Sequence, residues 1–157
     1  MSLFNLTDLH ATLARNQRLL GLDPGARTVG LALSDVRRVL ASPFGSMRRG
    51  KLADNAAEIL RIAKREDVGG LVVGLPLQMD GRLGPAAQAA RDWTFALCEA
   101  TGLPAAMWDE RLSSAEANRS LIEQGASRAK RAAVVDKMAA AVILQAALDS
   151  LHGRSDA

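Results

Sequence analysis

Cysteine and aromatic residues are scarce in this chain of 157 residues, and tyrosine is absent. The single cysteine, Cys98, excludes an intramolecular disulfide framework and a zinc site made of several cysteines, so the reducing cytoplasm is the expected compartment. Aromatic residues make up 3% of the chain. Binding of single-stranded nucleic acid through several stacked bases is therefore not expected.

Long apolar runs, repeats and Ser/Pro-rich linkers are missing as well. No segment approaches the roughly 18 uncharged apolar residues of a membrane span, so no membrane partner is expected. The composition, 48% hydrophobic and 24% charged, is that of one globular domain. We expect this domain over residues 18–151, with a helical extension over 1–17 and a tail over 152–157. The net charge of +3 permits a nucleic-acid partner.

The hydrophobic pattern along the chain predicts an α/β fold. Short alternating or continuous apolar segments predict strands over residues 18–23, 28–35, 39–47, 71–74 and 105–108. Apolar residues at helical spacing predict helices over residues 3–15, 51–66, 85–101, 113–123 and 131–151, with a small basic loop over 124–130. Because strands alternate with helices, we expect a mixed sheet with helices on both faces.

Asp23 is the first candidate site residue. It follows an apolar strand, so its carboxylate would lie at the carboxyl end of that strand, where open α/β sheets hold their sites. The alternative is that Asp23 only shapes a tight turn with Pro24 and Gly25. The spacing alone does not decide between the two interpretations.

A second acidic pair, Asp109 and Glu110, follows the last expected strand. If the first and last strands run parallel, their carboxyl ends lie at the same edge of the sheet. A solvated charge cluster between a strand and a helix would explain the same residues. On its own, this pair is therefore a weak signal.

Asp136 lies on the expected last helix. At 3.6 residues per turn it shares a row with Ala140, Ile143 and Ala147, and a carboxylate on an apolar face is costly unless it is paired or binds a metal. The alternative is an exposed aspartate in the first helical turn, stabilised by the helix dipole. Three carboxylates meeting at one sheet edge would suit Mg²⁺ or Mn²⁺.

Four blocks of sequence, in this order, resemble the YqgF/RuvX family, which is related to the RuvC-type Holliday junction resolvases within the RNase H-like superfamily. The blocks are LGLDPGARTVGLALSD (20–35), VGLPLQMDG (73–81), DERLSS (109–114) and DKMAAAVILQ (136–145). The resemblance covers about residues 18–150. Residues 1–17 precede the usual start of the family.

This resemblance implies an RNase H-like fold, with a five-stranded mixed sheet whose first three strands are antiparallel. It implies a metal-dependent nuclease that acts on pre-16S rRNA or on Holliday junctions. The catalytic and metal-binding residues would be Asp23, Glu110 and Asp136. Many RNase H-like nucleases carry an acid at the end of the fourth strand, where this chain has Gly74–Leu75–Pro76, so the second carboxylate would come from Glu110 or from Asp109. Glu110 is preferred for its reach.

The family mechanism would place two Mg²⁺ or Mn²⁺ ions at the scissile phosphate. Asp23 would bridge both ions, while Glu110 and Asp136 would each hold one. Basic residues would contact the flanking phosphates: Arg27, Arg111, Arg128, Lys130, Arg131 and Lys137. Cutting of symmetric junctions would favour a homodimer, and rRNA processing would bring ribosome-assembly partners.

Two other function classes fit parts of the pattern. An actin- or hexokinase-like nucleotide-binding fold has a similar G-L-D-x-G hairpin, but such proteins pair two domains and this chain holds one. A non-catalytic nucleic-acid-binding module could keep the fold without the chemistry. The presence of Asp23, Glu110 and Asp136 argues against the module.

Overall fold

The computed structural model describes residues 3–78, 80–112 and 128–153. The strands are β1 (Leu3–Phe4), β2 (Arg18–Pro24), β3 (Thr28–Ser34), β4 (Ala41–Arg48), β5 (Val68–Leu75) and β6 (Ala105–Asp109). The helices are α1 (Leu6–Thr12), α2 (Leu52–Glu66), α3 (Pro85–Thr101), the short 3₁₀ helix η1 (Glu110–Leu112) and α5 (Arg128–Leu151). The helix expected over 113–123 lies outside the described residues.

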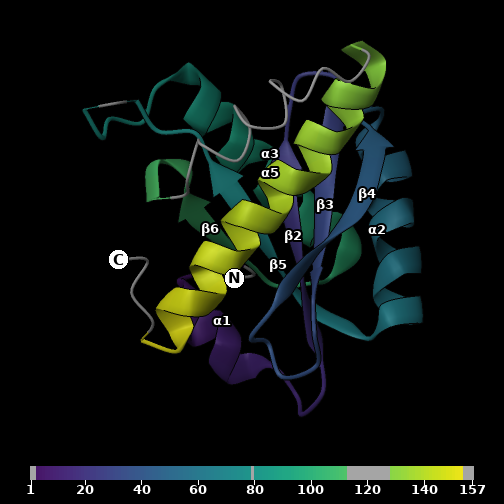
Figure 1. The fold of residues 1–157 in the computed structure, drawn as a ribbon, viewed down its shortest axis with the longest axis vertical. Coiled ribbons are helices and arrows are strands. Elements are labelled where there is room, and N and C mark those ends of the chain that lie inside the picture. The colour runs from purple at the N-terminus through teal and green to yellow at the C-terminus, as the bar shows by residue number, and fades with distance from the viewer. Residues whose placement is uncertain (1–2, 79, 113–127, 154–157) are drawn as a thin grey trace.

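The strands form one mixed sheet in the order β1-β6-β5-β2-β3-β4 (Figure 1). β2 pairs with β3, and β3 with β4, in antiparallel fashion, while β5 and β6 run parallel to β2. The expected five-stranded sheet, with its first three strands antiparallel, is confirmed. The structure adds β1 as a sixth strand beside β6. A strand of two residues is too short to show an alternating hydrophobic pattern. The sequence therefore predicted only a helix over residues 3–15.

Helices cover both faces of the sheet, as predicted (Figure 1). One core cluster joins Leu20 and Leu22 of β2 to residues of α2 and α3, such as Ile59 and Leu97. The other joins Leu19, on the opposite face of β2, to residues of α1 and α5. This alternation follows from the two-residue period of a strand. No described helix has the length and apolar character needed to cross a membrane.

Helix α5 lies close against the middle of the sheet. A Cβ atom at Gly21 would be 2.9 Å from Cβ of Leu144 and 3.3 Å from the carbonyl oxygen of Ala140, so only glycine fits beneath the helix. The helix begins at Arg128, and the prediction of a loop up to residue 130 is wrong at its end. Arg128, Ala129 and Lys130 are all compatible with a helix, so the basic composition was a poor sign of a loop.

The close approach at Gly21 predicts a stability difference between two glycines. Gly21→Ala should lower the free energy of unfolding by about 1–3 kcal/mol, because the added methyl group forces α5 away from β2. Gly45→Ala is the control, since a Cβ at Gly45 in β4 meets nothing within 4 Å. Urea unfolding of both variants measures the difference, and equal stabilities would contradict this packing.

Candidate functional site

The carboxyl ends of β2, β5 and β6 lie at one edge of the sheet because the three strands are parallel. Asp23 is the penultimate residue of β2, and Glu110 is the first residue after β6. Between these strands lies β5, whose residue at this level is Gly74, paired in register with Trp108 of β6. The two acids therefore face each other across β5.

The carboxyl groups of Asp23 and Glu110 are hydrogen-bonded to each other. The pKa of Glu110 is raised to about 8, first by burial and then by its hydrogen bond to Asp23 and by the charges of Asp23 and Asp109. Two carboxyl groups can share a hydrogen bond only when one of them carries a proton. The pair therefore holds a proton at neutral pH, and a cation bound there would replace it.

Gly74 provides the space that this pair needs. A Cβ atom at position 74 would be 2.5 Å from Oε1 of Glu110 and 3.0 Å from Cδ1 of Ile143 on α5. The Glu110 side chain thus fills the space that a side chain on β5 would occupy. The fourth strand of the core sheet carries no acid, and the following strand supplies one at the same place. The glycine of the VGLP block was the sequence signal for this arrangement.

Asp109, the neighbouring acid, is held by Arg111. The Nε of Arg111 donates to Oδ1 of Asp109 at 3.0 Å and Nη2 donates to Oδ2 at 2.6 Å, while the Arg111 amide also donates to Oδ1 at 3.0 Å. These hydrogen bonds, the side-chain ones above all, lower the pKa of Asp109. Of the two acids considered from the sequence, Glu110 is the one hydrogen-bonded to Asp23, and Asp109 fixes the start of η1.

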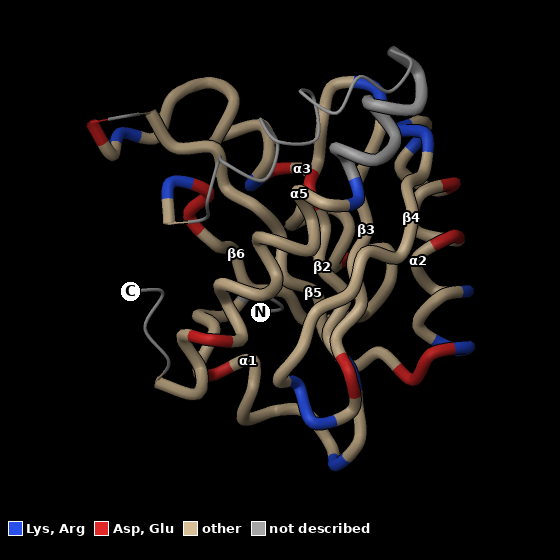
Figure 2. Tube along the Cα trace, viewed as in Figure 1, with Lys and Arg blue, Asp and Glu red and all other residues tan. Residues whose placement is uncertain are grey.

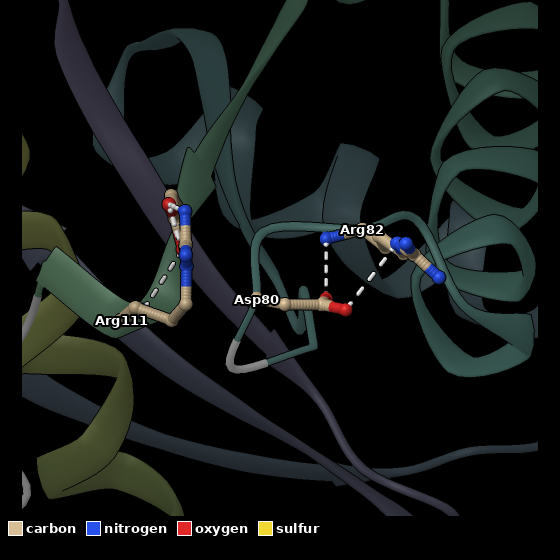
Figure 3. Close-up of polar contacts among 4 residues, drawn as sticks. Asp80, Arg82 and Arg111 are labelled. Carbon is tan, nitrogen blue, oxygen red and sulfur yellow. Dashed lines mark hydrogen bonds and ion pairs between the residues drawn. The ribbon is translucent and has the colours of Figure 1, made fainter.

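A turn that follows β5 lies beside Arg111 (Figure 3). Asp80 closes the turn: its Oδ1 accepts from the Arg82 amide at 3.0 Å, and its Oδ2 lies 3.3 Å from Nε of Arg82. Gly81 has a φ of +85°, and a Cβ atom there would come within 3.4 Å of Nη1 of Arg111. Arg111 thus lies between Asp109 and the turn with its side chain 37% exposed, so a phosphate would bind at the exposed edge of its guanidinium.

The other expected site residues divide into two groups. Arg27 is exposed in the β2–β3 turn, and Lys137 is half-buried on α5. For four residues on the first turns of α5 the structure describes the backbone but not the side chains: Arg128, Lys130, Arg131 and Asp136. Asp136 lies one turn before Ala140, toward the end of α5 that lies over the carboxyl edge of the sheet (Figure 1).

Carboxylate oxygens are the donors that Mg²⁺ and Mn²⁺ prefer. Asp23 and Glu110 supply such donors. Burial and the neighbouring Asp23 raise the pKa of Glu110, and a bound cation would relieve the repulsion between the two carboxyl groups. Within the described residues, no three His, Cys, Asp or Glu side chains form a group that could hold a metal ion. The third expected ligand, Asp136, has its side chain outside that part of the chain. The donor set fits a divalent cation.

Comparison with known proteins gives consistent results. A family model described as "RuvX: Holliday junction resolvase" matches residues 17–150. A protein of Acidiphilium cryptum named "Putative pre-16S rRNA nuclease" is 62% identical over 97% of this chain and 96% of its own length. A protein of the same name from Gluconacetobacter diazotrophicus is 64% identical over 96% of this chain and 98% of its own.

A solved structure described as "T. thermophilus RuvC in complex with Holliday junction substrate" has a similar fold, with a TM-score of 0.53. The alignment covers 87% of this chain and 96% of that one, at 16% sequence identity. At this identity the likeness establishes the fold alone. The expected RNase H-like, RuvC-like architecture is confirmed.

The raised pKa of Glu110 predicts a pH-dependent stability in the absence of divalent cations. Between the ordinary pKa of 4.5 and about 8, the folded protein retains a proton that the unfolded chain releases, so stability falls as the pH rises through this window. Glu110→Gln should remove this loss. The free energy of unfolding of the variant minus that of the wild type should therefore increase between about pH 5 and about pH 9.

The measurement is urea unfolding of both proteins in EDTA across this pH range. Burial, and then the charges of Arg38 and His152, lower the pKa of His10. Below pH 6.5, His10 therefore makes the stability rise with pH, opposite to the effect of Glu110. Since His10 is present in both proteins, the difference between their curves isolates Glu110. A difference that does not change with pH would show that the acid pair does not share a proton.

Proposed function

Because this chain belongs to the RuvX family, we propose that it is a nuclease that hydrolyses phosphodiester bonds during 5′-end processing of pre-16S rRNA. The observation that carries the chemistry is the hydrogen-bonded pair of Asp23 and Glu110 at the carboxyl edge of an RNase H-like sheet. The names of the two relatives favour rRNA as the substrate. The proposed compartment is the cytoplasm, where ribosome-assembly factors are the partners.

The second candidate substrate is a four-way DNA junction. The description of the matching family model favours it. Symmetric cutting of a junction requires two active sites and would make the protein a homodimer, whereas trimming of RNA requires only one site. Incubation of labelled pre-16S rRNA fragments and four-way DNA junctions with the protein in Mg²⁺ or Mn²⁺, in parallel, separates the two candidates.

We assign the binding of two divalent cations to Asp23, Glu110 and Asp136. When bound, the cations supply positive charge to the attacked phosphate and lower the pKa of a water molecule. Asp23 and Glu110 give up their shared proton on binding, since both must be ionised to act as ligands. Metal affinity should therefore rise with pH up to about 8.

The surrounding residues of the chain hold this pair in place. Gly74 leaves the space through which Glu110 reaches Asp23, and the hydrogen bonds between Arg111 and Asp109 fix the segment that bears Glu110. We assign contacts with the phosphates that flank the cut to Arg27, Arg111, Arg128, Lys130, Arg131 and Lys137. Such contacts position a strand without recognising its bases.

The first activity test compares variants of Asp23, Glu110 and Asp109. Asp23→Asn and Glu110→Ala should each abolish cleavage, because an amide or a methyl group cannot replace a carboxylate ligand. Asp109→Ala should cost much less activity than Glu110→Ala, because Asp109 positions η1 and does not bind the cation. Cleavage of a labelled pre-16S fragment measures all three.

Circular dichroism serves as the control that each variant is folded. Full activity of Asp23→Asn would overturn the nuclease mechanism. Greater loss in Asp109→Ala than in Glu110→Ala would show that the second ligand is Asp109.

The second activity test uses the space at Gly74. Gly74→Ala should displace the Glu110 carboxyl group, so that both cleavage and Mn²⁺ affinity fall by about 10- to 100-fold. The double variant Gly74→Asp/Glu110→Ala supplies a carboxylate from β5 in place of the one from η1, and should bind Mn²⁺ more tightly than Glu110→Ala alone. Calorimetric titration with Mn²⁺ measures affinity independently of cleavage.

Gly45→Ala is the matched control, since its added methyl group lies in open space. Unchanged Mn²⁺ affinity in Gly74→Ala would show that Glu110 can bind the cation from another position. No gain in the double variant would show that a carboxylate on β5 cannot replace Glu110.

A further inference from the structure

The β2–β3 turn and the end of β4 form one tip of the sheet. Thr28 at the start of β3 pairs with Arg48 at the end of β4, and the Arg49 amide donates to the carbonyl oxygen of Arg27 at 2.8 Å. Arg27, Arg48 and Arg49 therefore lie side by side. Lys51 follows two residues later, immediately before α2. We call Arg27, Arg48, Arg49 and Lys51 the basic tip.

The basic tip has a fixed backbone. Nη1 of Arg49 donates to the carbonyl oxygen of Gly25 at 2.8 Å, and its guanidinium lies over the ring of Trp93 on α3, 5.2 Å from the centroid. The buried Asn55 donates from Nδ2 to the carbonyl oxygen of Arg48 at 2.9 Å and accepts from the Gly50 amide at 3.1 Å. Arg49 and Asn55 thus hold the turn, β4 and α2 together.

The charges of the tip are unbalanced. Arg27, Arg48 and Lys51 are exposed, and within the described part of the chain none of them forms an ion pair. Two other exposed cations, Arg61 and Arg82, have carboxylate partners, whereas Arg15, Arg37 and Lys64 at the opposite edge form no ion pair among the described residues either. Figure 2 shows Lys and Arg gathered at the upper ends of β3 and β4. The tip is therefore a positive surface at the edge of the sheet that also bears Asp23.

We propose that the basic tip binds the sugar-phosphate backbone of the substrate beside the scissile bond. The substrate class rests on the proposed function. β4 lies two strands from β2, which is about 10 Å at the usual strand spacing. At about 3.4 Å per nucleotide along one strand of a helix, the tip reaches phosphates within about three nucleotides of the cut.

The tip contacts phosphates and does not read bases. Trp93, the aromatic residue at the tip, has its ring covered by the guanidinium of Arg49 and offers no platform for stacking. Arginine and lysine without aromatic partners bind the backbone through charge, independently of sequence. The tip therefore contributes binding affinity and positions the substrate strand along the protein. The choice of cleavage site depends on other contacts.

The test measures salt-dependent binding in the Asp23→Asn background, in EDTA, with a labelled RNA hairpin that carries a single-stranded flank. The tip variant is Arg27→Ala/Arg48→Ala/Lys51→Ala. Three lost phosphate contacts should flatten the plot of log K against log[salt] by about 2.7 on duplex or about 2.1 on single strand. Affinity at about 0.1 M salt should fall by more than about tenfold.

The matched control removes the same charge at the opposite edge of the sheet, with Arg15→Ala/Arg37→Ala/Lys64→Ala. These three residues are exposed, and the slope of this variant should equal that of the parent. A second control, Arg27→Lys/Arg48→Lys, keeps the charge of the tip and should keep the slope, which separates lost charge from a damaged fold.

An unchanged slope in the tip variant would overturn the proposal. An equally flattened slope in the opposite-edge control would overturn it as well. The assay needs neither cleavage nor metal, so its outcome is independent of the nuclease mechanism. A flattened slope for a protein that cleaves neither RNA nor junctions would leave the tip proposal standing and refute the nuclease. Cleavage together with an unchanged slope would support the nuclease and refute the basic-tip proposal.

Discussion

Two carboxyl groups meet at the edge of the sheet, and the surrounding structure is arranged to allow it. Burial and mutual repulsion both oppose the ionisation of Glu110 beside Asp23, and a shared proton relieves the repulsion. The contact requires parallel β2, β5 and β6, so that the ends of these strands coincide, and it requires Gly74, so that Glu110 can cross β5. A side chain at position 74 would separate the acids.

The acid pair lowers the stability of the metal-free protein in order to bind positive charge. A polar group held against its ordinary protonation preference is typical of functional sites, where local stability is exchanged for binding. The neighbouring contact between Asp109 and Arg111 shows the opposite arrangement, because its two partners stabilise each other's charge. Adjacent acids in one short motif thus have different roles, one in chemistry and one in positioning.

The sequence predicted the five main strands, their mixed topology and the place of Asp23, because burial on alternating residues is a local pattern. It did not predict β1, whose two residues show no period, or the start of α5, where basic residues suit a helix as well as a loop. It preferred Glu110 to Asp109 for its reach, but the residue pattern alone left both acids open. That choice depends on which side chain Arg111 engages and on the space above Gly74, and both depend on strand register.

The mixed topology also explains why opposite charges gather along one edge. Parallel strands place their carboxyl ends there, and these ends carry Asp23 and Glu110. β3 is antiparallel to both of its neighbours, so the β2–β3 turn and the end of β4 come to the same edge with Arg27 and Arg48. An all-parallel sheet would need long crossovers to bring these segments together. The antiparallel half of the sheet thus places cations next to the carboxylates of the parallel half, within about two strand spacings of Asp23.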